Sequence, residues 1–437
     1  MIALHPTPSR RRPHSVPGPR AVAGIALSLL CALALPPARA LSLAEAERLA
    51  VERDAVLRQL AAESEGMRER GIAEAQLMDP KLRLGAVNVP VDSFSLDAED
   101  MTMLEVGVSQ EFPAGRTREL ARKRMQQSAS ATDAVAADRR LTVQREVRRA
   151  WTELAYIAQV RELVQGQSSW VEQMRASARA RYASGEGKQL DVLQAGLDVA
   201  MLKEQLLDLD RDEAMRRAQL GRWIGEDEAR RAEANSLPAR AALEPLAVLE
   251  ERLLRHPAQL DFERRIEAAE TATSLAQQRN RPGWMLDLSY GLRSGDDMGG
   301  ESRPDLVSAM VTVDLPLFRG NRQDREVAAA RAEARGLHEM HDDHQRDMRA
   351  MLAEAWSVAG RTAELEQYYE SDLLPLAGQS VQAALLAYRA NRTMIDDVIA
   401  ARRVALETSL KHLRLAADRA QAQYDVEYLT GGDFNAQ

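Results

Sequence analysis

Hydrophobic and polar residues alternate along parts of this chain and follow helical spacing along most of the rest. The stretch Gly283–Arg293 places an apolar residue at nearly every second position, and the alternation returns between Leu306 and Leu315. Alternation with a period of two predicts a strand with one apolar face. An earlier pair of such stretches is found at Lys81–Val89 and Met103–Phe112. Four strands in a mainly helical chain raise the question of what covers their apolar faces.

Five landmarks recur at a spacing of 202 to 206 residues, which indicates two copies of one unit. The pairs are Pro80 and Pro282, Pro113 and Pro316, Trp151 and Trp356, Tyr182 and Tyr388, and Gly225 and Gly431. The sequence therefore predicts a first repeat over residues 41–242, a second repeat over residues 243–432 and a C-terminal tail over residues 433–437.

Each repeat is predicted to contain a first helix, two strands, a very long helix, a tight turn and a returning helix. The predicted helices are Leu43–Leu77, Thr117–Arg181 and Leu190–Trp223 in the first repeat, and Leu243–Asn280, Gln323–Tyr388 and Ile395–Leu429 in the second. At the turns, Gly185, Gly187 and Asn391 tolerate a left-handed backbone. The expected fold class is mainly α with a small β part.

The first long helix carries a heptad seam, the pattern of helices that pack at a shallow angle as a coiled coil. Its members are Val143, Val147, Ala150, Leu154, Ile157, Arg161 and Val164. A helix of about 65–70 residues spans roughly 100 Å, so a returning helix of half that length leaves room for a second helix on its end. We expect the returning helix of each repeat to stack on the first helix of the other repeat.

The first 40 residues have the pattern of a secretory signal. Arginines between residues 10 and 20 precede a short apolar run, and Ala38-Arg39-Ala40 fits a cleavage site. The alternative, a membrane anchor, is disfavoured because the run is too short to span a bilayer comfortably. Cleavage would remove the single cysteine, Cys31, together with five arginines, so the formal net charge would fall by five, from −8 to −13. An acidic chain without cysteine is not expected to bind nucleic acid or to form disulfides.

Lipid is the expected cover for the apolar strand faces. In the strand Gly283–Arg293 the expected lipid-facing residues are Trp284, Leu286, Leu288, Tyr290 and Leu292. A sandwich with a helix layer is the alternative, but the helices use their apolar seams on each other. Strands of about ten residues suit a tilted membrane strand, and the open edges of a four-stranded sheet would be costly in lipid. Two copies would form a filled eight-stranded barrel, and three would form a twelve-stranded barrel with room for a pore.

Four features together point to a known family: the doubled unit, the paired strands, the proline after the second strand and the hairpin-tip stretch "YASGEGKQLDVL". With them, residues 41–432 resemble the TolC family of outer-membrane efflux proteins. The stretch Ser302–Ala330 resembles the heavy-metal (CzcC/CusC-like) branch, the outer-membrane partners of cobalt–zinc–cadmium and copper–silver exporters. The resemblance implies a homotrimer with a twelve-stranded β-barrel continued by an α-helical barrel. Its place would be the outer membrane of a Gram-negative bacterium, extending into the periplasm.

The same resemblance implies the partners of the chain. An inner-membrane resistance-nodulation-division pump would deliver the substrate through a periplasmic adaptor, a membrane fusion protein. The strands would contact outer-membrane lipid. The family carries out no catalysis and uses no cofactor, and the sequence contains no nucleophile–base pair, phosphate-binding loop or Cys/His zinc motif that would indicate an enzyme.

A closed periplasmic tip is also implied by the resemblance. In the stretch "NRTMIDDVIAA", Arg392 aligns with the tip arginine of the family and Asp396 with the first of its aspartates. The second aspartate position falls near Ile399, and Asp397, which a one-residue shift places opposite Asp191, is the expected substitute. A threefold ring of aspartates would concentrate cations at the entrance. The alternative is that Asp396 and Asp397 cap a helix N-terminus.

Three histidines within "HEMHDDHQRD", His338, His341 and His344, are candidate metal ligands because their spacing of three places neighbouring pairs near one helix face. Three ligands rarely converge along a straight helix, so a solvated helix face is the alternative interpretation.

The leading functional hypothesis is a passive efflux duct for heavy-metal cations. A drug-efflux or type I secretion duct of the same fold is an alternative, because the inner-membrane pump selects most of the substrate. A soluble periplasmic coiled-coil scaffold is the alternative from a different class, and the alternating strands favour the channel over it.

Overall fold

The computed structural model describes residues 41–238, 242–390 and 392–432. The predicted signal segment (residues 1–40), the predicted tail (residues 433–437) and Asn391 lie outside these ranges. Among the described residues, no helix combines the length and the apolar character needed to cross a membrane.

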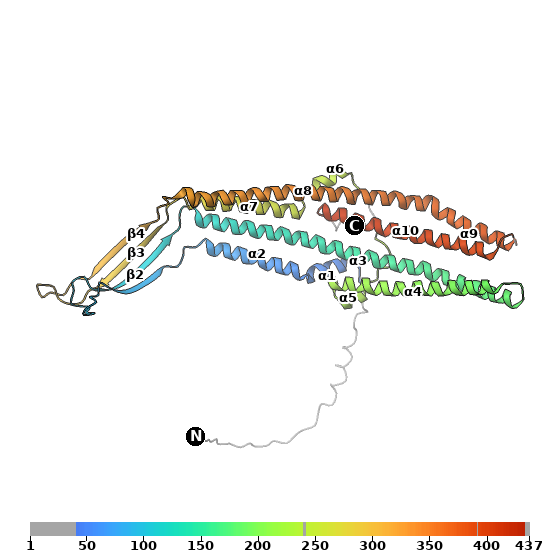
Figure 1. The fold of residues 1–437 in the computed structure, drawn as a ribbon, viewed down its shortest axis with the longest axis horizontal. Coiled ribbons are helices and arrows are strands. Elements are labelled where there is room, and N and C mark those ends of the chain that lie inside the picture. The colour runs from blue at the N-terminus through green and yellow to red at the C-terminus, as the bar shows by residue number, and fades with distance from the viewer. Residues whose placement is uncertain (1–40, 239–241, 391, 433–437) are drawn as a thin grey trace, which may run out of the picture. The chain divides into compact units, whose positions relative to one another are not determined.

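The same order of elements occurs twice along the chain (Figure 1). The first set consists of α1 (Leu43–Arg53), α2 (Ala55–Glu74), β1 (Lys81–Val87), β2 (Met103–Phe112), α3 (Thr117–Ala183), α4 (Gln189–Ile224) and the short α5 (Glu226–Arg230). The second consists of α6 (Leu246–Leu253), α7 (Pro257–Gln278), β3 (Trp284–Leu292), β4 (Leu306–Val313), a 3₁₀ turn η1 (Arg319–Asn321), α8 (Gln323–Tyr368), a π-helical turn η2 (Tyr369–Leu373), α9 (Leu374–Arg389) and α10 (Ile395–Leu429).

The long helices pack against pairs of shorter ones. In the first half, α3 contacts α1, α2 and α4. In the second half, α8 contacts α6, α7 and α10. The two halves meet because α3 also packs against α7 and α10. The predicted seam explains these contacts, since Val143, Val147, Leu154, Ile157 and Val164 are all buried.

The polar member of the seam, Arg161, is accommodated by ion pairs. Its guanidinium contacts Asp210 and, at 2.6 Å from Nη2 to Oε2, Glu213, and both acids belong to α4. A charged side chain can therefore remain in the seam because two carboxylates of the returning helix pair with it.

The pairing of the short helices differs from the sequence prediction. A buried cluster joins Ala46 and Ala50 of α1 to Leu220 and Ile224 at the end of α4, so the first and returning helices of the same half stack together (Figure 1). In the second half, buried residues of α6 likewise contact the end of α10. The expected stacking between different repeats is wrong, because each half completes its own column.

The segment after α4 explains why this stacking occurs within one half. This segment contains helix α5, and the backbone N–H of Leu41 donates to the carbonyl of Arg231 at 3.2 Å. Arg217 of α4 donates to the carbonyls of Ala229 and Ala232 at 2.9 and 3.1 Å. These bonds hold the end of α4 beside the start of α1.

Each predicted first helix is divided in two, because a residue with a helix-capping side chain interrupts it. Asp54 caps α2 by accepting from the backbone N–H of Leu57 at 2.8 Å, and its carboxylate pairs with Arg139 of α3 at 2.8 Å. At the equivalent place in the second half, His256 Nδ1 accepts from the N–H of Ala258 at 3.2 Å. Pro257 then begins α7 at the position where proline is tolerated.

The second long helix is not continuous, in contrast to the prediction of one helix over Gln323–Tyr388. The π-helical turn η2 separates α8 from α9, and Pro375 lies in the first turn of α9. Proline has no backbone N–H and clashes with the carbonyl four residues before it, so the wider turn accommodates a residue that an unbroken α-helix would not. Helix α3 contains no proline and runs unbroken over 67 residues.

Ion pairs connect the two halves at the level where the short helices meet. Arg148 of α3 pairs with Glu47 of α1 at 2.5 Å and with Glu427 of α10 at 2.8 Å. Burial raises the pKa of both carboxyl groups, although Arg148 favours their charged forms.

The burial of His256 near this junction leads to a prediction of how the stability of the protein depends on pH. Its side chain is fully buried, and burial lowers its pKa below the ordinary value of about 6.5. The unfolded chain then binds a proton more readily than the folded chain, so the free energy of unfolding should fall as the pH drops below about 6.5. Thermal unfolding between pH 7.5 and 5.0 should show a larger loss for the wild type than for His256→Asn, which retains a capping side chain but does not titrate. Parallel pH profiles for the two proteins would contradict this assignment.

Candidate functional site

The four strands form one antiparallel sheet in the order β1-β2-β3-β4. The central pairing, β2 with β3, joins the two halves of the chain and aligns Val108 with Leu288. The outer strands also pair antiparallel to their neighbours. Val106 of β2 lies opposite Leu84 of β1, and Val307 of β4 lies opposite Tyr290 of β3. Each observed strand lies within two residues of the range that the alternation predicts.

This register gathers most of the apolar residues of the four strands on one face. Residues directly opposite each other in an antiparallel sheet share a face. That face consists of Leu82, Leu84, Ala86, Leu104, Val106, Val108, Gln110, Phe112, Trp284, Leu286, Leu288, Tyr290, Leu292, Val307, Ala309, Val311 and Val313. Gln110 is its single amide, and we refer to these residues as the apolar sheet face.

The chain leaves the apolar sheet face largely uncovered. Leu82 is 65% exposed, Leu288 is 50% exposed and Val307 is 76% exposed. The predicted lipid-facing residues Trp284 and Tyr290 are also exposed, and Trp284 stacks on Phe112 with ring centroids 4.0 Å apart. An apolar surface of this extent on an isolated chain indicates a surface that contacts lipid or another protein.

The remaining predicted lipid-facing residues also lie on this face. Leu292 is exposed, and Leu286 is half-buried beside Val311 of β4. All five residues therefore project to the same side of β3.

The opposite face is more polar, although it includes Met103, Met285 and Met310. It carries an ion-pair ladder across three strands. Arg83 of β1 pairs with Glu105 of β2, with Nη2 and Oε1 2.8 Å apart, and its other nitrogen lies 3.9 Å from Oδ1 of Asp287 on β3. Asp287 is only 8% exposed. One face of the sheet thus suits lipid and the other suits water.

Both edges of the sheet are open in the described chain. Strands β1 and β4 each have a hydrogen-bonded neighbour on one side only. Edge strands present a row of unpaired backbone N–H and C=O groups that readily pair with another strand. The sheet is therefore suited to being extended by further copies of itself.

The α3–α4 turn lies at the other end of α3 from the sheet. Helix α3 begins five residues after β2 and continues for 67 residues, about 100 Å, before the turn. Gly185 has φ +80° and ends α3, with the N–H of Glu186 donating to the carbonyl of Arg181 at 2.9 Å. Gly187 is required for another reason, since a Cβ there would lie about 3.0 Å from the backbone nitrogen of Tyr182.

The α9–α10 turn repeats this hydrogen-bond pattern. The N–H of Arg392 donates to the carbonyl of Ala387 at 2.9 Å, a bond that spans five residues as in the first turn. Asn391, the predicted counterpart of Gly185, lies outside the described residues. The side chain of Arg392 is exposed, and no ion pair joins it to Asp396 in the described part of the chain.

Asp191 and Asp397 occupy the same position in the two returning helices. Each is the third residue of its helix, α4 or α10. The carboxylate of Asp191 accepts from the N–H of Lys188 at 3.2 Å, and that of Asp397 accepts from the hydroxyl of Thr393. Asp396 and Asp191 line one small cavity between the two turns.

The alternative role of Asp396 and Asp397 as helix caps is not observed. The N-cap residue of α10 is Met394, which makes no side-chain capping bond. The two aspartates lie in the first turn, where negative charge is favoured by the helix dipole.

The three predicted histidine ligands do not share one partner, although the rings of His341 and His344 both pack near Phe262. His338 Nε2 lies 3.6 Å from Oε1 of Glu270 on α7, whereas the His344 ring packs 4.9 Å from that of Phe262. His341 Nδ1 lies 3.9 Å from Oδ1 of the exposed Asp342. Metal binding by these three histidines stays a prediction.

A groove of about 440 Å³ between α3, α4 and α10 was not anticipated from the sequence. Arg402 of α10 lies over the ring of Trp170 on α3, 4.4 Å from its centroid, and burial lowers the pKa of its guanidinium. Arg403 pairs with Asp198 of α4 at 3.3 Å. The groove depends on contacts between the two repeats, which the pattern within one repeat does not encode.

Neither a protein-family model nor a curated protein sequence matches this chain. Solved structures do match. The outer membrane protein VceC from Vibrio cholerae has a TM-score of 0.73 and 18% identity, over 90% of this chain and 96% of that chain. The Campylobacter jejuni outer membrane channel CmeC has a TM-score of 0.72 and 12% identity, over 90% of this chain and 86% of that chain. CusC, described as a transmembrane channel, has a TM-score of 0.72 and 13% identity, over 89% of this chain and 92% of that chain.

The chain has the fold of these outer-membrane channels. The expected fold class, mainly helical with a small antiparallel sheet, is confirmed. The likeness to CusC is no greater than the likeness to VceC, so the fold does not single out the heavy-metal branch.

The two faces of the sheet predict opposite responses to a new charge. Leu288→Arg would place a cation on the apolar sheet face and should lower the free energy of unfolding from a bilayer by about 2–4 kcal/mol if the residue lies near the midplane. Ser308→Arg is the matched control, since Ser308 is exposed on the polar face of β4, and it should cost much less. Urea titration in lipid vesicles measures both values. Equal losses at the two positions would contradict this orientation of the sheet.

Proposed function

We propose that this protein is the outer-membrane channel of a tripartite efflux system. The observation that carries the proposal is the apolar sheet face, open at both strand edges and attached to helices about 100 Å long. Such a sheet fits a bilayer, and such helices are long enough to extend from it across much of the periplasm. A soluble coiled-coil scaffold would have no use for an exposed apolar sheet.

The working form is a homotrimer. Three four-stranded sheets close into a twelve-stranded barrel, which leaves a pore, whereas two would give eight strands and an interior filled by side chains. Closure satisfies the edge groups of β1 and β4, which is required in lipid. An exposed apolar stripe on α4 supports assembly at the helical level as well: it comprises Leu190, Leu193, Leu197 and Met201.

The protein resides in the outer membrane of a Gram-negative bacterium and extends into the periplasm. This location is supported by the secretory pattern of residues 1–40 and by the similarity in fold to VceC and CmeC, which are described as an outer membrane protein and an outer membrane channel. The partners are a periplasmic adaptor and an inner-membrane resistance-nodulation-division pump, which select and deliver the substrate.

Heavy-metal cations are the proposed substrate class. The support is the resemblance of Ser302–Ala330 to the heavy-metal branch, together with acidic residues at both tips, which favour cations over anions. Drug efflux and type I secretion by the same fold are the competing assignments.

Deletion of the gene tests the substrate. The host lacking this chain should become more sensitive to zinc, cobalt, cadmium or copper salts, and a plasmid copy should restore tolerance. Minimum inhibitory concentrations of these salts and of a panel of hydrophobic drugs provide the readout. Unchanged tolerance to metals with lost tolerance to drugs would favour drug efflux and would overturn the metal assignment.

The periplasmic tip is the proposed gate. Arg392 lies in the turn before α10 and Asp396 in the first turn of that helix. Asp191 and Asp397 occupy matching positions at the start of the two returning helices. Since Arg392 has no ion pair with Asp396 in the described part of the chain, its proposed acidic partner belongs to a neighbouring copy. An arginine–aspartate contact between copies would hold the three entrances closed together.

Single-channel conductance in planar bilayers tests the gate. The wild type should conduct weakly, and the double variant Arg392→Ser, Asp396→Ala should show a large rise because the contacts between copies are lost. Block by divalent cations added on the periplasmic side should weaken in the same variant, since the ring of negative charge is removed.

A control removes the same charges elsewhere at the tip. Arg179→Ser with Glu186→Ala alters exposed residues of the first hairpin and should conduct as the wild type does. If the Arg392–Asp396 variant forms intact trimers and still conducts like the wild type, these residues do not form the gate.

A further inference from the structure

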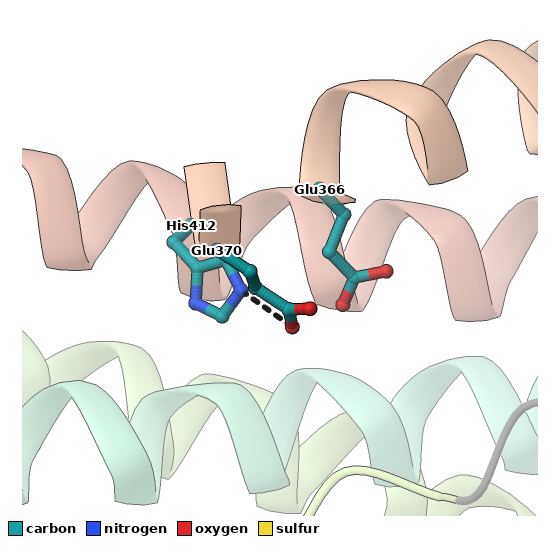
Figure 2. A group of neighbouring side chains, drawn as sticks. All are labelled: Glu366, Glu370 and His412. Carbon is teal, nitrogen blue, oxygen red and sulfur yellow. Dashed lines mark hydrogen bonds and ion pairs between the residues drawn. The ribbon is translucent and has the colours of Figure 1, made fainter. Parts of the chain in front are cut away.

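Three metal-ligating side chains converge where α8 ends against α10. Glu366 lies in the last turn of α8, Glu370 in the π-helical turn η2, and His412 near the middle of α10 (Figure 2). Among the described residues, this is the one group of three His, Cys, Asp or Glu side chains whose ligand atoms all lie within 4.8 Å of one another.

The spacing of these atoms is close to that of a metal site. His412 Nε2 lies 3.2 Å from Oε1 of Glu370, and the carboxylates of Glu366 and Glu370 lie near each other in Figure 2. Zinc binds nitrogen and oxygen ligands at about 2.0–2.2 Å, which places two ligands of a tetrahedral site roughly 3.3 Å apart. A small adjustment of side chains on two helices would therefore complete three protein ligands around one ion.

The π-helical turn contributes to this geometry. Glu366 and Glu370 are four residues apart, the spacing that places side chains on one helix face. The turn from Tyr369 to Leu373 widens the helix directly at Glu370. Single π-helical turns are rare and frequently occur at functional sites. The continuous helix α3 of the first half has no such turn, so within the described ranges this feature occurs in the second half alone.

Charge at the cluster favours a cation. Glu366 is only 3% exposed, and its Oε2 accepts from Arg419 Nη1 at 2.8 Å, which fixes the carboxylate in place. The two carboxylates and one guanidinium leave one net negative charge beside the imidazole of His412. Metal-binding carboxylates are commonly held by hydrogen bonds of this kind from a neighbouring side chain.

We propose that Glu366, Glu370 and His412 bind a divalent transition-metal ion of the zinc type. The ion is a resident one that links the α8–α9 junction to α10, and a water molecule completes its coordination. The proposal does not depend on the exported substrate, because it concerns an ion held by the helices of one chain. It differs also from the prediction for His338, His341 and His344, which belong to an earlier part of α8.

Zinc titration of the purified full-length protein tests the proposal. After removal of bound metal with a chelator, zinc chloride is titrated in competition with a chromophoric zinc indicator. The wild type should bind one zinc ion per chain at this site, and Glu370→Gln and His412→Gln should each weaken binding about tenfold or more. Glu370 is exposed and His412 is half-buried, so both substitutions should leave the fold intact, which circular dichroism verifies.

The matched control is the triple variant His338→Gln, His341→Gln, His344→Gln, which should retain the affinity of the wild type. Zinc chloride should also raise the melting temperature of the wild type and of this control, but not that of Glu370→Gln. Wild-type affinity in both single variants would overturn the proposal. So would loss of binding in the triple variant alone, which would place the ion at the three histidines.

Discussion

A sheet with one apolar face, one polar face and two open edges determines much of this molecule. In water its apolar face would be exposed, and in lipid the backbone groups of β1 and β4 would lack partners. Only an assembly that pairs the edges and directs the polar face toward a water-filled interior satisfies both requirements. The ladder from Arg83 to Glu105 and Asp287 is compatible with that interior, since charges there remain in contact with water.

Away from the sheet, the helices must also bury their apolar surface. The apolar seam of α3 packs against its neighbouring helices, and Val143, Val147 and Leu154 are buried there. Toward the tip the outer side of α4 retains exposed leucines, because a single chain has nothing to place against them. In the middle of the molecule, Arg148 pairs with Glu47 and Glu427 and so connects the two halves beside the apolar clusters.

The fold could be predicted from the sequence wherever a periodic pattern was long enough. The strands, the unbroken α3 and the α10 boundaries follow from alternation, heptad spacing and turn residues. The stacking of α1 on α4 could not, because it depends on Arg217 and on the backbone bond of Leu41, which no periodicity encodes. The groove at Trp170 and the cluster at His412 were missed for a similar reason: their residues come from helices far apart in the sequence.

Each half of the chain has the same internal arrangement, because it stacks its own first helix on its own returning helix and contributes one strand pair to the sheet. The halves are joined in the sheet by the pairing of β2 with β3. In the proposed trimer, six such units surround the axis with approximate sixfold symmetry. The β2–β3 pairing within one chain is then the internal counterpart of the β4–β1 pairing between chains. A ring of six copies of one such unit would pair every strand edge in the same way. The π-helical turn, which among the described residues occurs only in the second half, is one difference between the two units.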